Sequence, residues 1–130
     1  MERIMSEYIV HKSVANYIKM QYPNVIFTSD SSGIRLSIGN ALKMLSLKSK
    51  DKIPDMIILQ PNEHYKALII EIKAIDKSPF LKDGSLSKNK HVKEQNNTLQ
   101  KLNEIGYKAV FGVGFDHCKD IIDEYFNLNK

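Results

Sequence analysis

Two short apolar stretches dominate the hydrophobic pattern of this chain. Residues 54–59 (PDMIIL) and 67–74 (ALIIEIKA) are rich in Ile and Leu, and the turn-forming residues 60–64 separate them. Each stretch has the length and composition of a β-strand. Because the connection between them is short, we expect an antiparallel hairpin. In that hairpin Asp55 lies opposite Glu71, to within one residue of register.

The alternation of side chains along the second strand separates polar from apolar residues. With a period of two, Glu71 and Lys73 share one face, and the isoleucines at 70 and 72 share the other. Two carboxylates and an ammonium group then lie at the end of an apolar sheet. A buried carboxylate needs a compensating partner, and a divalent cation with oxygen ligands is one such partner. The alternative is that Asp55 begins a strand and that Glu71 and Lys73 form a solvated pair at an edge.

The amino-terminal part of the chain predicts a helix over residues 3–22, which Pro23 ends. Its inward stripe follows spacings of three and four and consists of Ile4, Glu7, His11, Val14 and Ile18. Glu7 is a carboxylate where this stripe requires an apolar side chain. It is either a boundary residue whose carboxylate reaches water or a further acidic ligand aimed at the sheet. Periodicity alone favours the boundary position.

Two further elements precede the hairpin. Residues 24–29 predict a strand with β-branched side chains, followed by a turn at residues 30–33. Residues 38–47 predict a helix with Ser37 as its N-cap. We expect three residues of this helix to face inward, namely Ala41, Leu42 and Leu45. Residues 46–52 are polar and basic and predict a loop.

After the hairpin, residues 75–87 predict a long loop that leaves directly from Lys73. Loops of this length in small domains are often mobile or functional. Residues 89–105 predict a helix that Gly106 ends at the C′ position. The inward stripe of this helix consists of Val92, Gln95, Leu99 and Leu102. Gln95 either bonds a backbone group in the core or orients Lys73 or a substrate phosphate.

A strand over residues 107–114 and a last helix complete the predicted elements. Asp116 is the candidate cap of this helix, whose apolar face consists of Ile121, Ile122, Tyr125 and Phe126. Joining the strand to the hairpin through a crossover helix gives a right-handed parallel connection. The pattern therefore predicts an α/β fold, a small mixed β-sheet flanked by helices. At 130 residues we expect one domain that spans residues 1–130.

Composition excludes several classes of protein and site. No apolar run has the length of a membrane span, and the amino terminus shows no signal-peptide pattern. The single cysteine, Cys118, excludes an internal disulfide and a cysteine-based zinc site, and we interpret it as a buried helix residue rather than a nucleophile. The four histidines show no metal-ligand spacing. These features fit a reducing, cytoplasmic compartment.

The charge of the chain is compatible with a nucleic acid partner. The net charge is +4 and the sequence pI is about 9.1. Lysines flank the hairpin on both sides, before Asp55 at Lys43, Lys48, Lys50 and Lys52, and after Lys73 at Lys77, Lys82, Lys88, Lys90 and Lys93. They are either a solvated surface or phosphate contacts around the hairpin.

These motifs, in this order, resemble those of the PD-(D/E)XK nucleases, and more narrowly those of the VRR-NUC family. The resemblance rests on Ile53-Pro54-Asp55, Ile70-Glu71-Ile72-Lys73-Ala74, His91-Val92-Lys93-Glu94-Gln95 and Gly106-Tyr107-Lys108-Ala109. Ser6-Glu7 and the final helix lie where the family places them, so that the resemblance covers nearly the whole chain. It implies a restriction-endonuclease-like PD-(D/E)XK core, in a single VRR-NUC-like nuclease domain.

The resemblance also implies roles for the site residues. Asp55 and Glu71 would hold a divalent metal, Mg²⁺ or Mn²⁺, and Lys73 would position the attacking water and the scissile phosphate. Glu7 would be the amino-terminal acidic residue and a further metal ligand, an assignment that the family pattern favours over the boundary position. Glu2 is the alternative candidate for that place.

Two further points of the family pattern concern the surroundings of the site. Gln95 would be the glutamine of the family motif and part of the catalytic set. The family often has a glycine-rich approach to its Pro-Asp, whereas this chain has Lys50-Asp51-Lys52-Ile53, so the shape of the approach loop differs. Seven lysines would contact DNA phosphates, namely Lys50, Lys52, Lys77, Lys82, Lys88, Lys90 and Lys93.

The activity implied by the resemblance is that of a metal-dependent, structure-specific DNA endonuclease. Small stand-alone members of the family resemble junction-cleaving enzymes that act as homodimers. Cuts on opposing strands of a four-way junction need two symmetric active sites, and a C₂ dimer supplies them. We therefore expect a homodimer that cleaves four-way (Holliday) junctions in a phage-infected or prokaryotic cell. The alternatives are a nuclease of the same fold acting on flaps, nicked or linear duplex, and a non-catalytic DNA-binding module.

Overall fold

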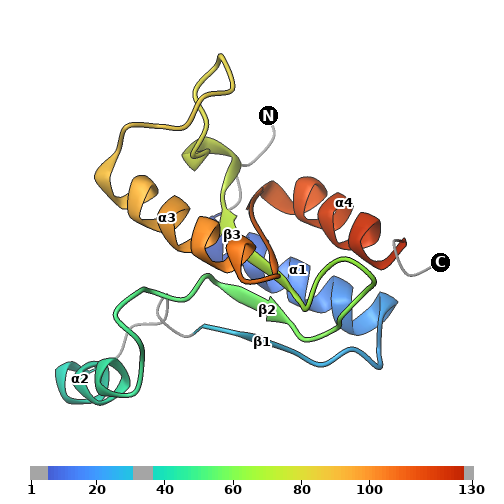
Figure 1. The fold of residues 1–130 in the computed structure, drawn as a ribbon, viewed down its shortest axis with the longest axis horizontal. Helices are drawn as coiled ribbons and strands as arrows, with labels where there is room; N and C mark the ends of the chain where they lie inside the picture. The colour runs from blue at the N-terminus through green and yellow to red at the C-terminus, as the bar shows by residue number, and fades with distance from the viewer. Residues whose placement is uncertain (1–5, 31–36, 128–130) are drawn as a thin grey trace.

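A small mixed sheet forms the centre of the computed structural model, which describes residues 6–30 and 37–127. Its strands in these residues (Figure 1) are β1 (Phe27–Ser29), β2 (Met56–Ile58), β3 (Leu68–Lys73) and β4 (Lys108–Val113). They lie in the order β1-β2-β3-β4. β1 to β3 pair antiparallel, and β4 lies parallel to β3. The small mixed sheet expected from the sequence is therefore confirmed.

The register of the central hairpin is the one predicted from its turn. Met56 pairs with Ile70 across β2 and β3, so Asp55, one residue before β2, lies opposite Glu71. The Asp55 carboxylate accepts a hydrogen bond from the Ile72 backbone N–H over 2.8 Å. The Asp55 carbonyl accepts one from the Asp30 N–H, also over 2.8 Å. Asp55 is thus hydrogen-bonded to β3 on one side of β2 and to the residue that follows β1 on the other.

Helices cover both faces of the sheet (Figure 1). α1 (Glu7–Gln21) and α4 (Gly114–Asn127) pack on one face, and α3 (Lys90–Glu104) covers the other. Ile70 and Ile72 belong to the core beneath α1 and α4, whereas Ile69 packs with Leu99 of α3. All six residues of β3 are buried. The strand that carries Glu71 and Lys73 is therefore central in the sheet and held on both faces.

Two helix caps lie where the sequence predicts them. Ser37 caps the amino end of α2 (Ile38–Ser46), and its Oγ accepts from the Asn40 N–H over 3.2 Å. Gly106, with a φ of +107°, follows α3 at the C′ position, where the left-handed conformation disfavours a side chain. The amino-terminal helix begins at Glu7 and not at the predicted residue 3, because Ser6 is its extended N-cap and its Oγ accepts from the Ile9 N–H over 3.3 Å. Its first predicted residues, with Glu2 and Ile4, and the turn at residues 31–33 lie outside the described residues.

The predicted inward face of α2 is wrong. None of its residues is buried, and Leu42 and Leu45 are 61% and 67% exposed. Figure 1 shows α2 standing away from the sheet and the other helices. The apolar stripe of the helix is real, but no part of the described chain covers it.

Three other elements differ from the predicted ones. α4 begins at Gly114, which has a φ of +79°, so Asp116 lies within the first turn and is not the cap. The first strand is limited to β1. The predicted loop over residues 75–87 contains a 3₁₀ turn, η2 (Ile75–Lys77), and a bridge between Phe80 and Leu86. Within the described residues, no helix has both the length and the apolarity needed to cross a membrane.

Candidate active site

Asp55 and Glu71 place two carboxylates opposite each other at one end of the central hairpin. Glu71 and Lys73 are only 7% and 8% exposed, because β3 is interior to the sheet and α3 covers this face. The alternative of a solvated edge pair is therefore wrong. Burial first, and then the negative charge of Asp55, raise the pKa of Glu71 to about 8, although the Lys73 ammonium acts in the opposite direction.

Gln95 of α3 points at Glu71. Its Nε2 donates a hydrogen bond to Glu71 Oε1 over 2.8 Å and lies 3.2 Å from Nε2 of His91, one helical turn earlier. Gln95 therefore bonds neither the backbone nor Lys73, two of the three partners considered from the sequence; the third was a substrate phosphate. It orients the carboxylate of Glu71.

Glu7 brings a third carboxylate toward this pair from the first turn of α1. Partial burial and the negative charge of Asp55 raise the pKa of Glu7, while Lys73, His11 and Lys52 lower it. Glu7 thus lies close enough to Asp55 and Lys73, two of the predicted catalytic residues, for their charges to shift its pKa. Within residues 6–30 and 37–127, however, no group of three or more His, Cys, Asp or Glu side chains converges as a metal cage.

The donor set at this place fits a hard divalent cation. Mg²⁺ is commonly held by one or two carboxylates together with water and substrate phosphate oxygens, and Asp55 and Glu71 are such a pair. The mutual repulsion that raises the pKa of Glu71 is the repulsion that a bound cation would relieve. Gln95 Oε1 is also buried without a hydrogen-bond partner. Asp55 and Glu71 are therefore the residues that would hold a metal.

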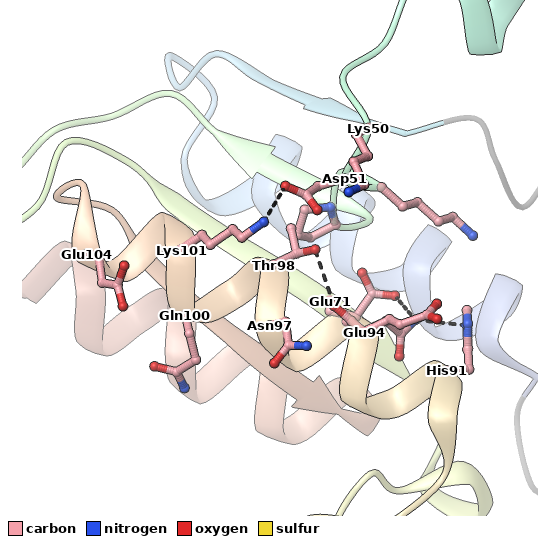
Figure 2. Close-up of a pocket in the computed structure, with 13 residues that line it drawn as sticks. Lys50, Asp51, Glu71, His91, Glu94, Asn97, Thr98, Gln100, Lys101 and Glu104 are labelled. Carbon is pink, nitrogen blue, oxygen red and sulfur yellow. Dashed lines mark hydrogen bonds and ion pairs between the residues drawn. The ribbon is translucent and has the colours of Figure 1, made fainter.

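A groove of about 720 Å³ opens beside Glu71, between α3 and the segment before Asp55 (Figure 2). Lys50 and Lys52 line it on the loop side, and Gln95 and His91 line it on the helix side. An ion pair of 3.0 Å between Lys101 and Asp51 connects the two walls. The Lys-Asp-Lys approach that departs from the family pattern thus forms one wall of a groove next to the carboxylates.

The seven lysines predicted to contact nucleic acid are all exposed, but they do not form one cluster. Lys50 and Lys52 line the groove. Lys77 lies in η2, and Lys82 lies in the loop that follows it. The remaining three lie at and just before the start of α3, namely Lys88, Lys90 and Lys93.

Two residues that sequence reasoning did not assign to the site lie beside it. His91 contacts Gln95, and the i, i+4 spacing of the two residues could have indicated this contact. His11 Nε2 lies 2.9 Å from Ser29 Oγ, and His11 also acts on the pKa of Glu7, four residues earlier on α1. Cys118 is buried, as predicted, and burial raises the pKa of its thiol to about 12. This thiol is therefore protonated and inert at neutral pH.

Comparisons with known proteins bear on the fold. A scan against models of protein families matches nothing, and no curated protein matches the chain. A solved structure described as a "VRR_NUC domain protein" is similar to this chain with a TM-score of 0.67 and 22% sequence identity. The match covers 99% of this chain and 94% of that one. The chain therefore has the α/β nuclease fold of a VRR_NUC domain, as its sequence motifs indicate.

Proposed function

We propose that this protein is a metal-dependent DNA endonuclease of the PD-(D/E)XK type. The observation that carries the proposal is the placement of Asp55 opposite a buried Glu71, with the Lys73 ammonium on the same strand. A buried cluster of this kind is expensive to maintain unless it binds something. The fold that the chain shares with a VRR_NUC domain protein supports the same activity.

Each group of the site has a separate task in phosphodiester hydrolysis. Mg²⁺ or Mn²⁺ held by Asp55 and Glu71 would supply Lewis acidity, which lowers the pKa of water and polarises the phosphate. The water oxygen bonds to phosphorus and gives up a proton to the solvent. The bond from phosphorus to the leaving sugar oxygen breaks, and that oxygen takes up a proton from the solvent. Lys73 stabilises the negative charge that the phosphate oxygens gain in this step. Gln95 holds Glu71, and the Ile72 N–H holds Asp55.

The substrate we propose is branched DNA, in particular a four-way junction. The lysines that flank the site supply phosphate contacts that do not depend on sequence. Lys50 and Lys52 line the same groove as Glu71. Binding through such contacts weakens steeply as salt increases. Recognition would then follow the shape of the DNA rather than its bases.

Cleavage of a junction on opposing strands requires two active sites, and we propose a homodimer that contacts through α2. The exposed stripe of α2, Ile38, Ala41, Leu42 and Leu45, carries no charge, because Lys43 lies on the opposite side of the helix. An uncharged apolar stripe is self-complementary across a two-fold axis, whereas it offers nothing to a phosphate backbone. A helix of nine residues is also too short to be stable in water without packing.

The edge of the sheet formed by β4 is an unsuitable dimer contact. The Asn103 side chain accepts from the Ala109 N–H and donates to the Ala109 carbonyl, each over 2.9 Å. His117 Nδ1 accepts from the Val113 N–H over 2.9 Å. These side chains occupy backbone groups that a second strand would need for pairing. The β4 edge is therefore not free to pair with a strand of a second copy.

The test is cleavage of a labelled four-way junction, compared with flapped, nicked and linear duplex, in Mg²⁺, Mn²⁺ or EDTA. Wild type should make paired, symmetric nicks that need metal, and Asp55→Asn should bind the junction without cutting it. Asp120→Asn is the matched control, because Asp120 is an exposed carboxylate of α4. If the protein cuts only linear or flapped DNA, that DNA is its substrate and the four-way junction is not. Binding of DNA without cleavage in the presence of either metal would contradict the proposed nuclease activity.

A further inference from the structure

A second groove, of about 460 Å³, begins at Asp55 and runs along α1. Its helix wall presents Tyr8, Lys12, Asn16 and Lys19. These residues follow one another at spacings of four, four and three, which places them along a single face of the helix. None of the lysines assigned to DNA from the sequence lies on this face. The groove is therefore a separate feature that needs its own explanation.

The side chains of this helix wall are suited to an anionic ligand. Lys12 and Lys19 are exposed cations, and Asn16 adds an amide donor. Across the groove, Asp30 forms an ion pair of 2.8 Å with Lys48, which offsets its charge. The remaining negative charges of the groove, Glu7 and Asp55, lie at the end that meets the candidate active site. The rest of the groove thus carries two lysines and an amide donor on a lining that is otherwise largely apolar.

The groove is continuous with the catalytic carboxylates. Asp55 lines the groove along α1, whereas Glu71 lines the groove along α3. The two residues lie opposite each other in the hairpin. One groove therefore reaches the carboxylate pair at Asp55, from the α1 side, and the other reaches it at Glu71, from the α3 side.

We propose that the scissile DNA strand passes from the α3 groove across the Asp55–Glu71 pair into the α1 groove, an inference that rests on the proposed function. Lys12 and Lys19 contact the phosphates on one side of the cleaved bond. Seven residues of helix span about 10 Å at a rise of ~1.5 Å, which is roughly three nucleotides of one strand at ~3.4 Å each. The length of the basic wall thus matches a short run of backbone.

Tyr8 has a separate role at the site end of this groove. Tyr8 is 63% exposed and lines the groove one residue from Glu7. An exposed aromatic ring beside a phosphate track is a platform on which an unpaired base can stack. Tyr8 therefore stacks with the base that flanks the cleaved phosphate when junction arms splay apart.

The test of the phosphate track uses the double variant Lys12→Gln/Lys19→Gln, with Lys66→Gln as control. Lys66 is also exposed, but it lies just before β3, at the opposite end of that strand from Glu71. The probe is a fluorescein-labelled four-way junction in EDTA. The double variant should bind about tenfold more weakly, and the slope of log affinity against log salt should fall by about 1.8. KM should rise while kcat at saturating DNA stays the same.

The outcomes separate this inference from the proposed function. If wild type cuts the junction and the double variant keeps its affinity and salt slope, the α1 groove does not hold the strand. If wild type neither binds nor cuts DNA, the nuclease itself is contradicted. If polyglutamate of equal charge competes as effectively as DNA, the groove binds an acidic protein partner, and the proposal is overturned.

The stacking role is tested by Tyr8→Ala against Tyr8→Phe. Loss of the ring should weaken binding of a junction or single strand by about tenfold, whereas Tyr8→Phe should bind like wild type. Fully paired linear duplex offers no free base, so its affinity should not change in either variant. Equal losses in the two variants would show that the hydroxyl matters and not the ring, which contradicts stacking.

Discussion

Gln95 Nε2 donates a hydrogen bond to Glu71 Oε1 over 2.8 Å, and this contact joins α3 to the candidate metal ligand. Partners that orient a metal ligand typically change metal affinity or activity by about 10- to 100-fold when they are removed. We therefore expect Gln95→Ala to lower kcat within this range and to raise the Mg²⁺ concentration needed for half-maximal activity. Titration of Mg²⁺ in the cleavage assay measures both effects.

The variant Gln95→Glu distinguishes orientation from charge at the same position. A carboxylate there adds negative charge next to Glu71 and raises its pKa further. Activity at neutral pH should fall more than in Gln95→Ala, and part of it should return as the pH is raised. A pH profile equal to that of Gln95→Ala would contradict this electrostatic account. Asn96→Ala, on α3 but outside the groove that Glu71 lines, is the control.

Glu71 itself should make the metal-free fold depend on pH. Its pKa is raised from 4.5 to about 8, so between these values the folded state holds a proton that the unfolded state releases. The contribution of Glu71 to the free energy of unfolding is therefore fully present below pH 4.5 and is lost as the pH rises through 8. Each pKa unit is worth about 1.4 kcal/mol, so the effect amounts to several kcal/mol.

Glu71→Gln removes this titration and keeps an acceptor for Gln95. In EDTA the variant should unfold at a higher denaturant concentration than wild type at pH 8.5, and the two should agree at pH 4. Mg²⁺ should stabilise wild type and not the variant. A variant that is less stable than wild type at pH 8.5 would show that burial of the Glu71 charge is compensated within the chain.

The hairpin, the site and the helix faces differ in how far the sequence could predict them. The placement of Asp55 opposite Glu71 was predictable, because a short turn and the period of two fix both register and face. The Gln95–Glu71 contact was not, since it depends on the distance between α3 and the sheet. Periodicity predicted only that Gln95 points inward. The error at α2 has the same origin, because an apolar stripe does not reveal what covers it.

Asp123 should stabilise the packing of α1 on α4 at neutral pH. Its Oδ1 accepts hydrogen bonds of 2.6 Å from the hydroxyls of Tyr17 and Tyr22, and Lys119 donates to Oδ2 over 3.0 Å. Burial acts to raise the pKa of Asp123, but these hydrogen bonds lower it on balance. The contribution is therefore present above pH 3.8 and is lost as the pH falls below it.

Asp123→Asn should lower the free energy of unfolding at pH 7 by about 1.5–3 kcal/mol, the range for hydrogen bonds to a charged group. Urea denaturation at pH 7 and at pH 3 measures the change, which should shrink at the lower pH. Glu124→Gln, the exposed neighbour on α4, is the control and should have little effect. An equal loss at both pH values would contradict the role of the ionised carboxylate.

Gly112 of β4 should tolerate no side chain. A Cβ added there would lie 2.5 Å from Cys118 Sγ and 2.9 Å from Ile70 Cγ2, inside the core beneath α4. We expect Gly112→Ala to lower the free energy of unfolding by about 1–3 kcal/mol through overpacking. Gly39→Ala is the control, because nothing lies within 4 Å of that position in α2. It should leave stability unchanged or raise it by about 1 kcal/mol.

Variants of the proposed dimer contact on α2 test the proposal that two active sites of a homodimer cut one junction. Leu42→Glu/Leu45→Glu places two like charges per copy against their counterparts across the two-fold axis, while Lys43→Glu changes charge on the opposite side of the same helix. Light scattering should show a dimer for wild type and Lys43→Glu, and a monomer for the double variant. Because the monomer keeps Asp55, Glu71 and Lys73, it should still nick a junction, but the paired cuts on opposing strands should separate into independent events. A double variant that remains a dimer and cuts in pairs would place the interface elsewhere on the molecule.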